Sequence, residues 1–73
     1  MLTLDCQSLK CPLPLLKLKV ALAEIESGTQ IELLATDPIS CRDIPVFCQK
    51  TGHRLVEQSD QPVFRFVIEK AEG

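Results

Sequence analysis

The 73-residue sequence contains no tryptophan, no tyrosine and only three phenylalanines. Its core therefore has to be assembled mainly from leucine, isoleucine and valine, and a core of this size contributes only about 3–5 kcal/mol unless other features reinforce it. The length allows one domain, 1–73, and excludes a two-domain organisation.

Basic clusters and long apolar segments are also missing. Eight Lys and Arg stand against ten Asp and Glu, for a net charge of −2, so the charge pattern of a nucleic-acid-binding protein is absent. No apolar segment reaches transmembrane length, and Asp5 interrupts the region where a secretory signal needs about 7–15 apolar residues. We therefore expect a cytoplasmic protein with no direct membrane insertion and no direct contact with nucleic acid.

The apolar periodicity predicts the order β-α-β-α-β-β. Strands are expected at 2–5, 31–35, 53–58 and 63–69, helices at 12–27 and 41–51, and a hairpin loop at 59–62. With right-handed crossovers, both helices cover one face of a four-stranded mixed sheet. The predicted fold class is therefore α+β, a two-layer α/β sandwich.

Helix ends and core faces follow from the same pattern. Gly28 and Gly52 are predicted at the helix C-termini, and Ser40 with Asp43 resembles a capping box. Pro45 has to lie in the first turns of the second helix. The spacing of apolar residues predicts the two core-facing stripes, Leu15, Leu18, Leu22 and Ile25 in the first helix and Ile44, Phe47, Cys48 and Thr51 in the second.

Cys11 is the strongest candidate for chemistry. It immediately precedes Pro12, which predicts that it occupies the N-cap of the first helix, where free backbone N–H groups and the helix dipole stabilise an anion. Lys10 acts in the same direction. A thiol in such a place has its pKa lowered from about 8.5 to roughly 3.5–7.5, which makes it a nucleophile at neutral pH. The alternative is that Cys11 is a small apolar filler at the cap.

A second apolar stripe begins beside Cys11. Leu13, Leu16 and Val20 lie at i, i+3 and i+7 and are displaced from the predicted core stripe. An exposed apolar strip next to a reactive sulfur suits partner docking. The alternative is that these side chains pack partly under the edge of the sheet or are scattered surface residues.

Several short motifs are distributed along the chain, in and between the predicted strands and helices. They are Leu4-Asp5, Leu9-Lys10-Cys11-Pro12-Leu13-Pro14, Asp37-Pro38, Arg42-Asp43-Ile44-Pro45, Phe47-Cys48 and Gly52-His53. Together they resemble the small bacterial sulfur carriers of the TusA (SirA-like) family over essentially the whole chain. The most specific element is the C-P-x-P motif that starts at Cys11. Ser8 departs from the family pattern, which has glycine there, and puts the geometry of the Cys11 loop in question.

The resemblance implies a sulfurtransferase-type persulfide carrier rather than a conventional turnover enzyme, with no metal and no organic cofactor. Cys11 would accept a sulfane sulfur from a donor such as a cysteine desulfurase or a rhodanese and pass it to an acceptor protein. Pro12 and Pro14 would hold the approach to the helix rigid. Family members serve tRNA thiolation, molybdenum cofactor synthesis or sulfur oxidation, and the free protein is expected to be a monomer.

The other cysteines receive weaker hypotheses. In the cytosol thiols stay reduced, so a disulfide framework is not expected. Cys6 and Cys11 in the first strand-to-helix junction and Cys41 at the second are predicted to share one edge of the sheet. Cys41, with Cys6 as its rival, is a candidate resolving thiol or second sulfur site, and simple packing is the alternative for both. Cys48 is predicted to be inert packing, and His53 a capping or surface residue.

Three other functions stay open. The chain could be a thiosulfate-handling partner of a membrane sulfur transporter. It could be a zinc module built from the four cysteines or His53, although the spacings C-x4-C and C-x6-C lack the close pairs of structural zinc sites. It could also be a nucleic-acid-binding module of the same topology, against which the acidic charge argues.

Overall fold

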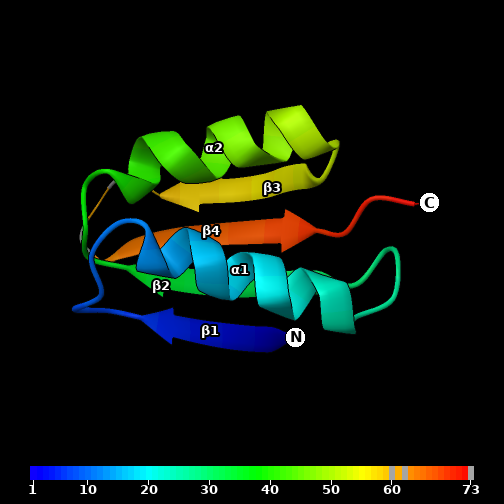
Figure 1. Cartoon of the computed structure of the whole chain (residues 1–73), viewed down its shortest axis with the longest axis horizontal. Coiled ribbons are helices and arrows are strands. Elements are labelled where there is room, and N and C mark those ends of the chain that lie inside the picture. Colours follow the sequence, from blue (N-terminus) through cyan, green and yellow to red (C-terminus); the bar gives the residue numbers. More distant parts are fainter. Residues whose placement is uncertain (60, 62, 73) are drawn as a thin grey trace.

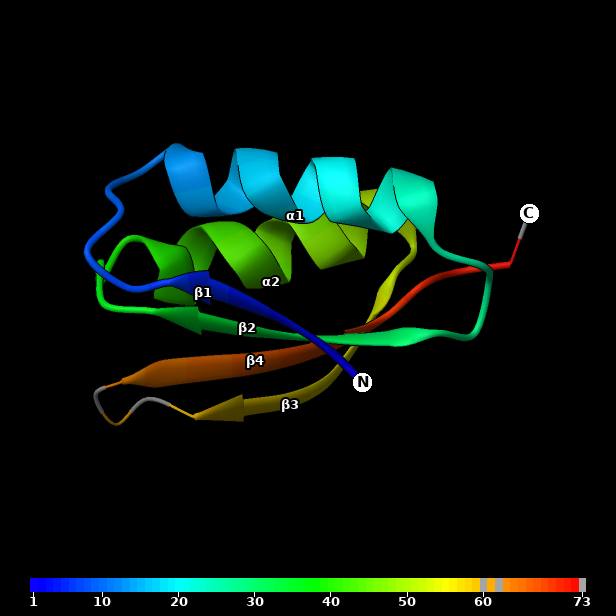
Figure 2. The ribbon, with the colours of Figure 1, turned by 90° about the horizontal axis from the view of Figure 1, so that it is seen from below.

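The computed structural model describes residues 1–59, 61 and 63–72. Its elements follow the predicted order: β1 (Leu2–Cys6), α1 (Leu13–Glu24), β2 (Gln30–Ala35), α2 (Ser40–Thr51), β3 (Arg54–Ser59) and β4 (Phe64–Glu69). Both helices lie on one face of the sheet (Figure 1; Figure 2). The predicted α+β sandwich is confirmed. Asp60 and Pro62 of the predicted hairpin loop lie outside the described residues.

The strand order is β1-β2-β4-β3, which places β1 and β2, the two strands that lead into helices, side by side. β1 runs parallel to β2, whereas β4 is antiparallel to both β2 and β3. Because β1 and β2 are parallel, their carboxyl ends meet, and Cys6 pairs with Ala35 at that edge. The loops that lead into α1 and α2 therefore start side by side (Figure 1).

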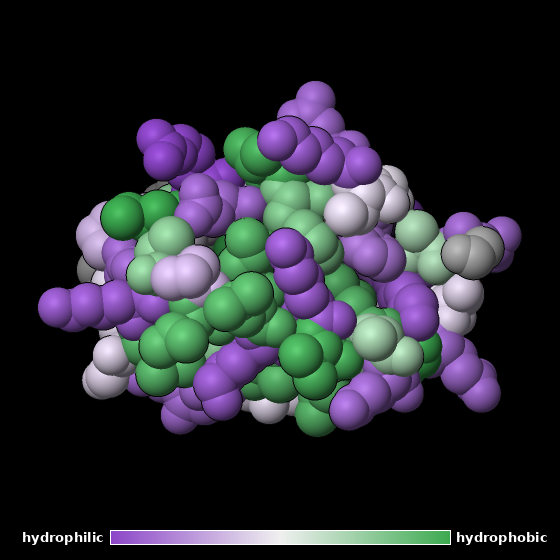
Figure 3. Space-filling view, in the orientation of Figure 1, coloured by the Kyte–Doolittle hydropathy of each residue, from purple (hydrophilic) through white to green (hydrophobic). Residues whose placement is uncertain are grey.

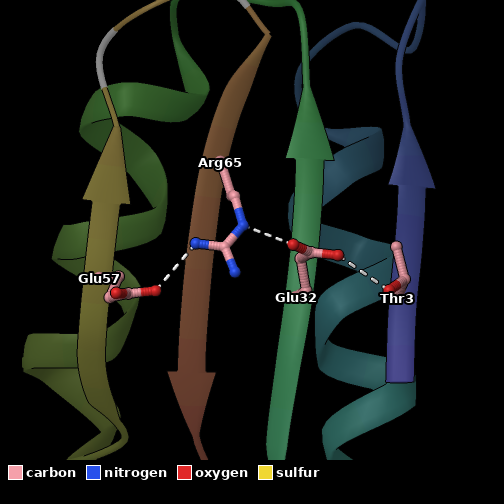
Figure 4. A network of polar contacts seen from close by, with 4 residues as sticks. All are labelled: Thr3, Glu32, Glu57 and Arg65. Atoms are coloured by element: carbon pink, nitrogen blue, oxygen red, sulfur yellow. Dashed lines mark hydrogen bonds and ion pairs between the residues drawn. The ribbon is translucent and has the colours of Figure 1, made fainter. Parts of the chain in front are cut away.

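The two faces of the sheet differ in chemistry because alternate strand residues point to opposite sides. Ile31 and Leu33 of β2 and Phe66 and Ile68 of β4 belong to the buried core beneath the helices. The helix-free face carries a polar network across all four strands (Figure 4): Thr3 donates to Glu32, Glu32 pairs with Arg65, and Arg65 Nη1 lies 2.8 Å from Glu57 Oε2. Arg65 therefore lies on the face opposite Phe66 and Ile68.

α1 is shorter than the predicted helix 12–27, and its core face is rotated. Leu18 and Leu22 of the predicted stripe are buried, but Leu15 and Ile25 are only partly buried, and Pro14 and Ala21 complete the buried face. Apolar residues occur nearly all around this helix, so periodicity does not determine which side the sheet covers.

The two glycines behave differently. Gly28 is not the C-cap of α1, because the helix ends at Glu24 and its C-cap is Ile25, which has an extended backbone. Gly28 instead takes a φ of +85° in the following turn, where its N–H donates to the carbonyl of Lys70. Gly52 caps α2 as predicted, with a φ of +83° and its N–H bonded to the Cys48 carbonyl.

The start of α2 contradicts the capping-box prediction. Among the described residues no side chain caps this helix; its N-cap is Ile39, and Ser40 is buried in the first turn. The Ile39 N–H donates to Asp37 Oδ1 at 3.0 Å instead. Asp43 is thereby free to face the neighbouring loop.

Pro45 and Thr51 of α2 each leave a polar backbone or side-chain group that needs a hydrogen-bond partner. Pro45 lies inside the helix, and since proline has no N–H it cannot bond the carbonyl of Cys41; Gln58 Nε2 from β3 donates to that oxygen at 3.3 Å. The spacing predicts Thr51 in the core stripe, but this residue is exposed, and its hydroxyl donates to the Phe47 carbonyl. A threonine hydroxyl is satisfied by its own helix backbone more easily than by an apolar core.

Candidate functional site

Cys11 lies where the β1–α1 loop meets the β2–α2 loop. Its N–H donates to Asp37 Oδ2 at 2.6 Å, and its thiol donates to Asp43 Oδ2 at 3.1 Å. A third bond joins the same loops, from the Ser8 N–H to Thr36 Oγ1 at 2.8 Å. The cysteine is therefore exposed but attached at both its backbone and its sulfur to the segment that follows β2.

Cys11 is not the N-cap of α1, contrary to the prediction. The helix begins at Leu13, its N-cap is Pro12, and Cys11 lies one residue earlier, before a cis peptide bond. The Leu13 N–H is already bonded to the Lys10 carbonyl at 2.8 Å, and Pro12 and Pro14 have no N–H to offer. The helix end therefore supplies the Cys11 sulfur with little of the anion stabilisation expected of a helix N-terminus.

The predicted lowering of the Cys11 pKa is also wrong. The hydrogen bond to Asp43 raises the pKa of this thiol, and partial desolvation and the charges of Asp43 and Asp37 act in the same direction, with only Arg42 opposing them. A carboxylate that accepts the S–H proton favours the neutral form. The charge of Lys10 acts on Asp37 rather than on the thiol, and it helps to lower the pKa of that carboxyl.

Asp37 is the residue that holds the two loops together. Its two oxygens accept the N–H groups of Cys11 and Ile39, and these bonds, followed by Lys10, lower the pKa of Asp37. This one carboxylate thus orients the Cys11 backbone and also bonds Ile39, the N-cap residue of α2. Neither Asp37 nor Asp43 was singled out for the site from the residues alone. The signal was present, because both follow β2 and so lie at the edge where the two parallel strands end.

The four cysteines occupy different environments, and all are free thiols. Cys6 is the last residue of β1 and so lies at the predicted edge, but its side chain is fully buried in the core, and this burial raises the pKa of its thiol. Cys41 is half-buried against the core cluster, and its role as a second thiol stays a prediction. Cys48 is 3% exposed, and desolvation raises its pKa to about 11, in agreement with the predicted packing role.

His53 serves the C-terminal segment rather than a helix cap. Its Nδ1 accepts the Ala71 N–H at 2.9 Å, and its ring lies 5.8 Å from the Phe47 ring. The proposed zinc ligands are not brought together: across residues 1–59, 61 and 63–72 no group of three or more His, Cys, Asp or Glu is placed to hold a metal ion. No helix in the described part of the chain is long and apolar enough to cross a membrane.

Ser8 has a clear structural consequence for the Cys11 loop. Its φ is +70°, the left-handed region that favours glycine. This is the position at which the family resemblance predicted glycine. The loop keeps that conformation with serine in place, and the Ser8 N–H bond to Thr36 contributes to holding it.

An apolar groove lies beside the site, between α1 and the edge strand β1. Leu13 and Leu16 are each 46% exposed and Val20 is 62% exposed, so the second stripe of α1 is on the surface. Apolar side chains gather along this side of the molecule (Figure 3). The groove is lined by Leu2, Leu4, Leu13, Leu16, Lys17, Val20, Ala21 and Glu24.

Fold and site together define a small α+β protein that presents one exposed thiol at a sheet edge, with an apolar groove next to it. Residues 2–70 match the model of the family described as Sulfurtransferase TusA. The chain belongs to the TusA family.

Individual relatives agree with this assignment. A protein of Neisseria meningitidis serogroup A is 46% identical over 68 residues, which cover 92% of each chain. The sulfur carrier protein TusA of Allochromatium vinosum is 39% identical over 69 residues, covering 93% of this chain and 91% of the relative. The crystal structure of a SirA-like protein from Desulfitobacterium hafniense superimposes with a TM-score of 0.84 at 29% identity, covering 99% of this chain and all of that one.

Proposed function

We propose that this chain is a sulfur carrier that accepts a sulfane sulfur as a persulfide on Cys11 and passes it to an acceptor protein. The observation that carries the proposal is the position of Cys11: of the four cysteines it is the exposed one, and its backbone is held by Asp37. A carrier needs an accessible sulfur on a fixed support. The relative from Allochromatium vinosum bears the name of a sulfur carrier.

The transfer is balanced without any oxidant or reductant. The Cys11 sulfur attacks the terminal sulfur of the donor's persulfide, a new S–S bond forms, and the old S–S bond breaks. The donor leaves as a thiol after taking up the proton that Cys11 loses. In the second half, a nucleophile of the acceptor takes the terminal sulfur, and Cys11 departs as thiolate and is protonated again.

The residues of the motif divide the remaining work. Pro14 is buried in the core and anchors the start of α1, while Pro12 and Leu13 are exposed beside Cys11. Lys10 stabilises the ionised Asp37 that orients the Cys11 backbone. These residues position the sulfur, and Cys11 alone forms bonds to it.

Docking is assigned to the apolar strip of α1 formed by Leu13, Leu16 and Val20. These side chains are exposed and line the groove that begins next to Cys11. A strip of this kind suits transient contact with proteins, because burying it on binding removes apolar surface from water. The partners are a sulfur donor, such as a cysteine desulfurase or a rhodanese, and a downstream acceptor protein, and the carrier acts as a monomer in the cytoplasm.

Intact-mass analysis after incubation with donors tests the proposal. One arm contains a cysteine desulfurase with cysteine, and a second contains a rhodanese with thiosulfate. The wild-type protein is expected to gain one sulfur, and Cys11→Ser is expected to gain none. Cys41→Ser is the matched control, because it removes a half-buried thiol outside the motif; loss of the adduct in this variant would support a second thiol instead.

The two arms also separate the donor routes. Loading with cysteine and the desulfurase supports the pathways of tRNA thiolation or molybdenum cofactor synthesis. Loading only with thiosulfate supports sulfur oxidation or service to a membrane sulfur transporter. A folded protein that gains no sulfur in either arm contradicts the carrier function.

A further inference from the structure

The contact between Asp43 and Cys11 is not required by the carrier function. Asp43 comes from the first turn of α2, 32 positions after the cysteine, and its Oδ2 accepts the thiol proton at 3.1 Å. The side chain of Asp43 is 26% exposed, so it is held against the loop rather than extended into solvent. Its other oxygen lies 3.9 Å from Nε of Arg42, whose side chain is 81% exposed. Solvent screens that ion pair strongly.

The proton is what makes this contact favourable. If Cys11 were a thiolate, its sulfur would face the Asp43 carboxylate at the same distance with no proton between the two anions. The other groups around the sulfur do not offset this repulsion, because Asp37 is also negative, Lys10 acts on Asp37, and Arg42 is mostly in water. The site is thus arranged to keep a free sulfur protonated.

We propose that Asp43 is a positioning residue that restrains Cys11: its carboxylate holds the unloaded sulfur as a thiol and makes the free protein slow to react with disulfides and other electrophiles. A sulfur donor has to relieve this restraint by offering Asp43 a cationic or hydrogen-bond-donating group. The donor step rests on the proposed function, whereas the restraint is a property of the free chain.

Relief of the restraint changes no oxidation state. When the donor's group bonds Asp43, the Cys11 proton passes to the departing donor thiolate, while Cys11 forms its bond to the terminal sulfur. The Asp43 carboxylate neither gains nor loses a proton in this step, and it stays bonded to the donor's group from start to finish. A protein without such a group would meet the thiol form and react slowly, because the thiolate is the nucleophile in these exchanges.

The rate of iodoacetamide alkylation of Cys11, followed over a range of pH by site-resolved mass spectrometry, tests the restraint. Asp43→Asn replaces an oxygen that favours the thiol with an amide that can donate to a thiolate. At neutral pH we expect alkylation of Cys11 to be about three- to tenfold faster in this variant, because each unit by which the pKa falls gives about tenfold more thiolate. The midpoint of the pH profile moves down accordingly.

A matched control separates this effect from a general change of charge. Glu26→Gln also removes one negative charge, from an exposed residue beyond the opposite end of α1, and is expected to leave the Cys11 rate within about twofold of wild type, because distant surface charges are screened. Asp43→Ala provides a second variant, which removes the carboxylate without adding a donor. Labelling of buried Cys48 reports any variant that unfolds.

Two results would overturn the proposal. In the wild-type protein itself, a Cys11 profile with a midpoint below that of an unstructured cysteine peptide contradicts the restraint, even if no variant folds. Slower or unchanged alkylation in folded Asp43→Asn shows that the carboxylate activates the sulfur or does not affect it. Sulfur loading by the desulfurase with cysteine is scored separately, so failure of the carrier function leaves the alkylation result intact.

Discussion

The thiols of Cys11 and Cys48 are both disfavoured as thiolates, but for different physical reasons. Cys48 is 3% exposed in the core, and burial raises its pKa to about 11. Cys11 is exposed, and its pKa is raised mainly by one hydrogen bond to Asp43. Burial can be relieved only by unfolding, whereas a single side-chain contact can be relieved by a docking partner. Exposure and thiolate character are therefore separate properties, and Cys11 has the first without the second.

Labelling of the native protein gives the largest expected contrast. We expect iodoacetamide to modify Cys11 under native conditions while Cys6 and Cys48 stay unmodified, because both are buried. All four thiols should react once the chain is unfolded in denaturant. Site-resolved mass spectrometry measures the ratio. Equal labelling of Cys11 and Cys48 in the folded protein would remove the distinction between the two environments.

Charged substitutions on the docking strip separate exposure from partner access. Leu16→Asp combined with Val20→Asp is expected to slow sulfur transfer from the donor about tenfold or more, because a charge buried on docking has to be desolvated. The alkylation rate of Cys11 should change far less than the transfer rate, because Asp43 still accepts the thiol proton and the new carboxylates lie in solvent on α1. The rate of sulfur transfer from the desulfurase with cysteine, followed in samples quenched at successive times, measures the effect. Unchanged transfer would place docking elsewhere on the surface.

Asp37, the residue that holds the two loops together, makes the stability of the protein depend on pH. Its pKa is lower in the folded protein than in the unfolded chain, so the unfolded state binds its proton first as the pH falls. The stability that Asp37 contributes is therefore complete above an unfolded pKa of about 3.9 and is lost as the pH falls from there through the folded pKa. Urea unfolding of wild type and Asp37→Asn between neutral and acidic pH measures it. If the free energy of unfolding of the wild type fell no more steeply on acidification than that of Asp37→Asn, this role of Asp37 would be contradicted.

Ser8→Gly gives the smallest expected change. Ser8 has a φ of +70°, a conformation that costs a residue with a Cβ roughly 1 kcal/mol or more and costs glycine nothing. Part of this gain is offset by the greater entropy of glycine in the unfolded chain. We expect the free energy of unfolding to rise by about 0.5 kcal/mol, measured by urea denaturation. Ser27→Gly, at an exposed position in the loop after α1, is the comparison, and equal effects of both substitutions would argue against strain at Ser8.

Much of the fold could be predicted from local pattern. The alternation in 31–35 and 64–68, the proline-marked start of the first helix and Gly52 at the end of the second each correspond to an observed element. The prediction failed where apolar residues occur on several sides of α1, because a helical stripe identifies apolar positions without showing which side the sheet covers. It also failed at Asp43, because the local pattern predicts a capping role, whereas the side chain bonds a residue far away in the sequence.

By itself, the sequence determined the element order and the place of Cys11 between a strand and a proline-rich helix start. These depend on periods and turn residues that act over a few positions. Only the tertiary structure decided the state of the sulfur, because the groups that set it, Asp37 and Asp43, arrive from the neighbouring loop and helix. The local prediction relied on a helix dipole, and the fold replaced it with a carboxylate. An electrostatic environment is a sum over neighbours in space, and those neighbours are known only once the strands have paired.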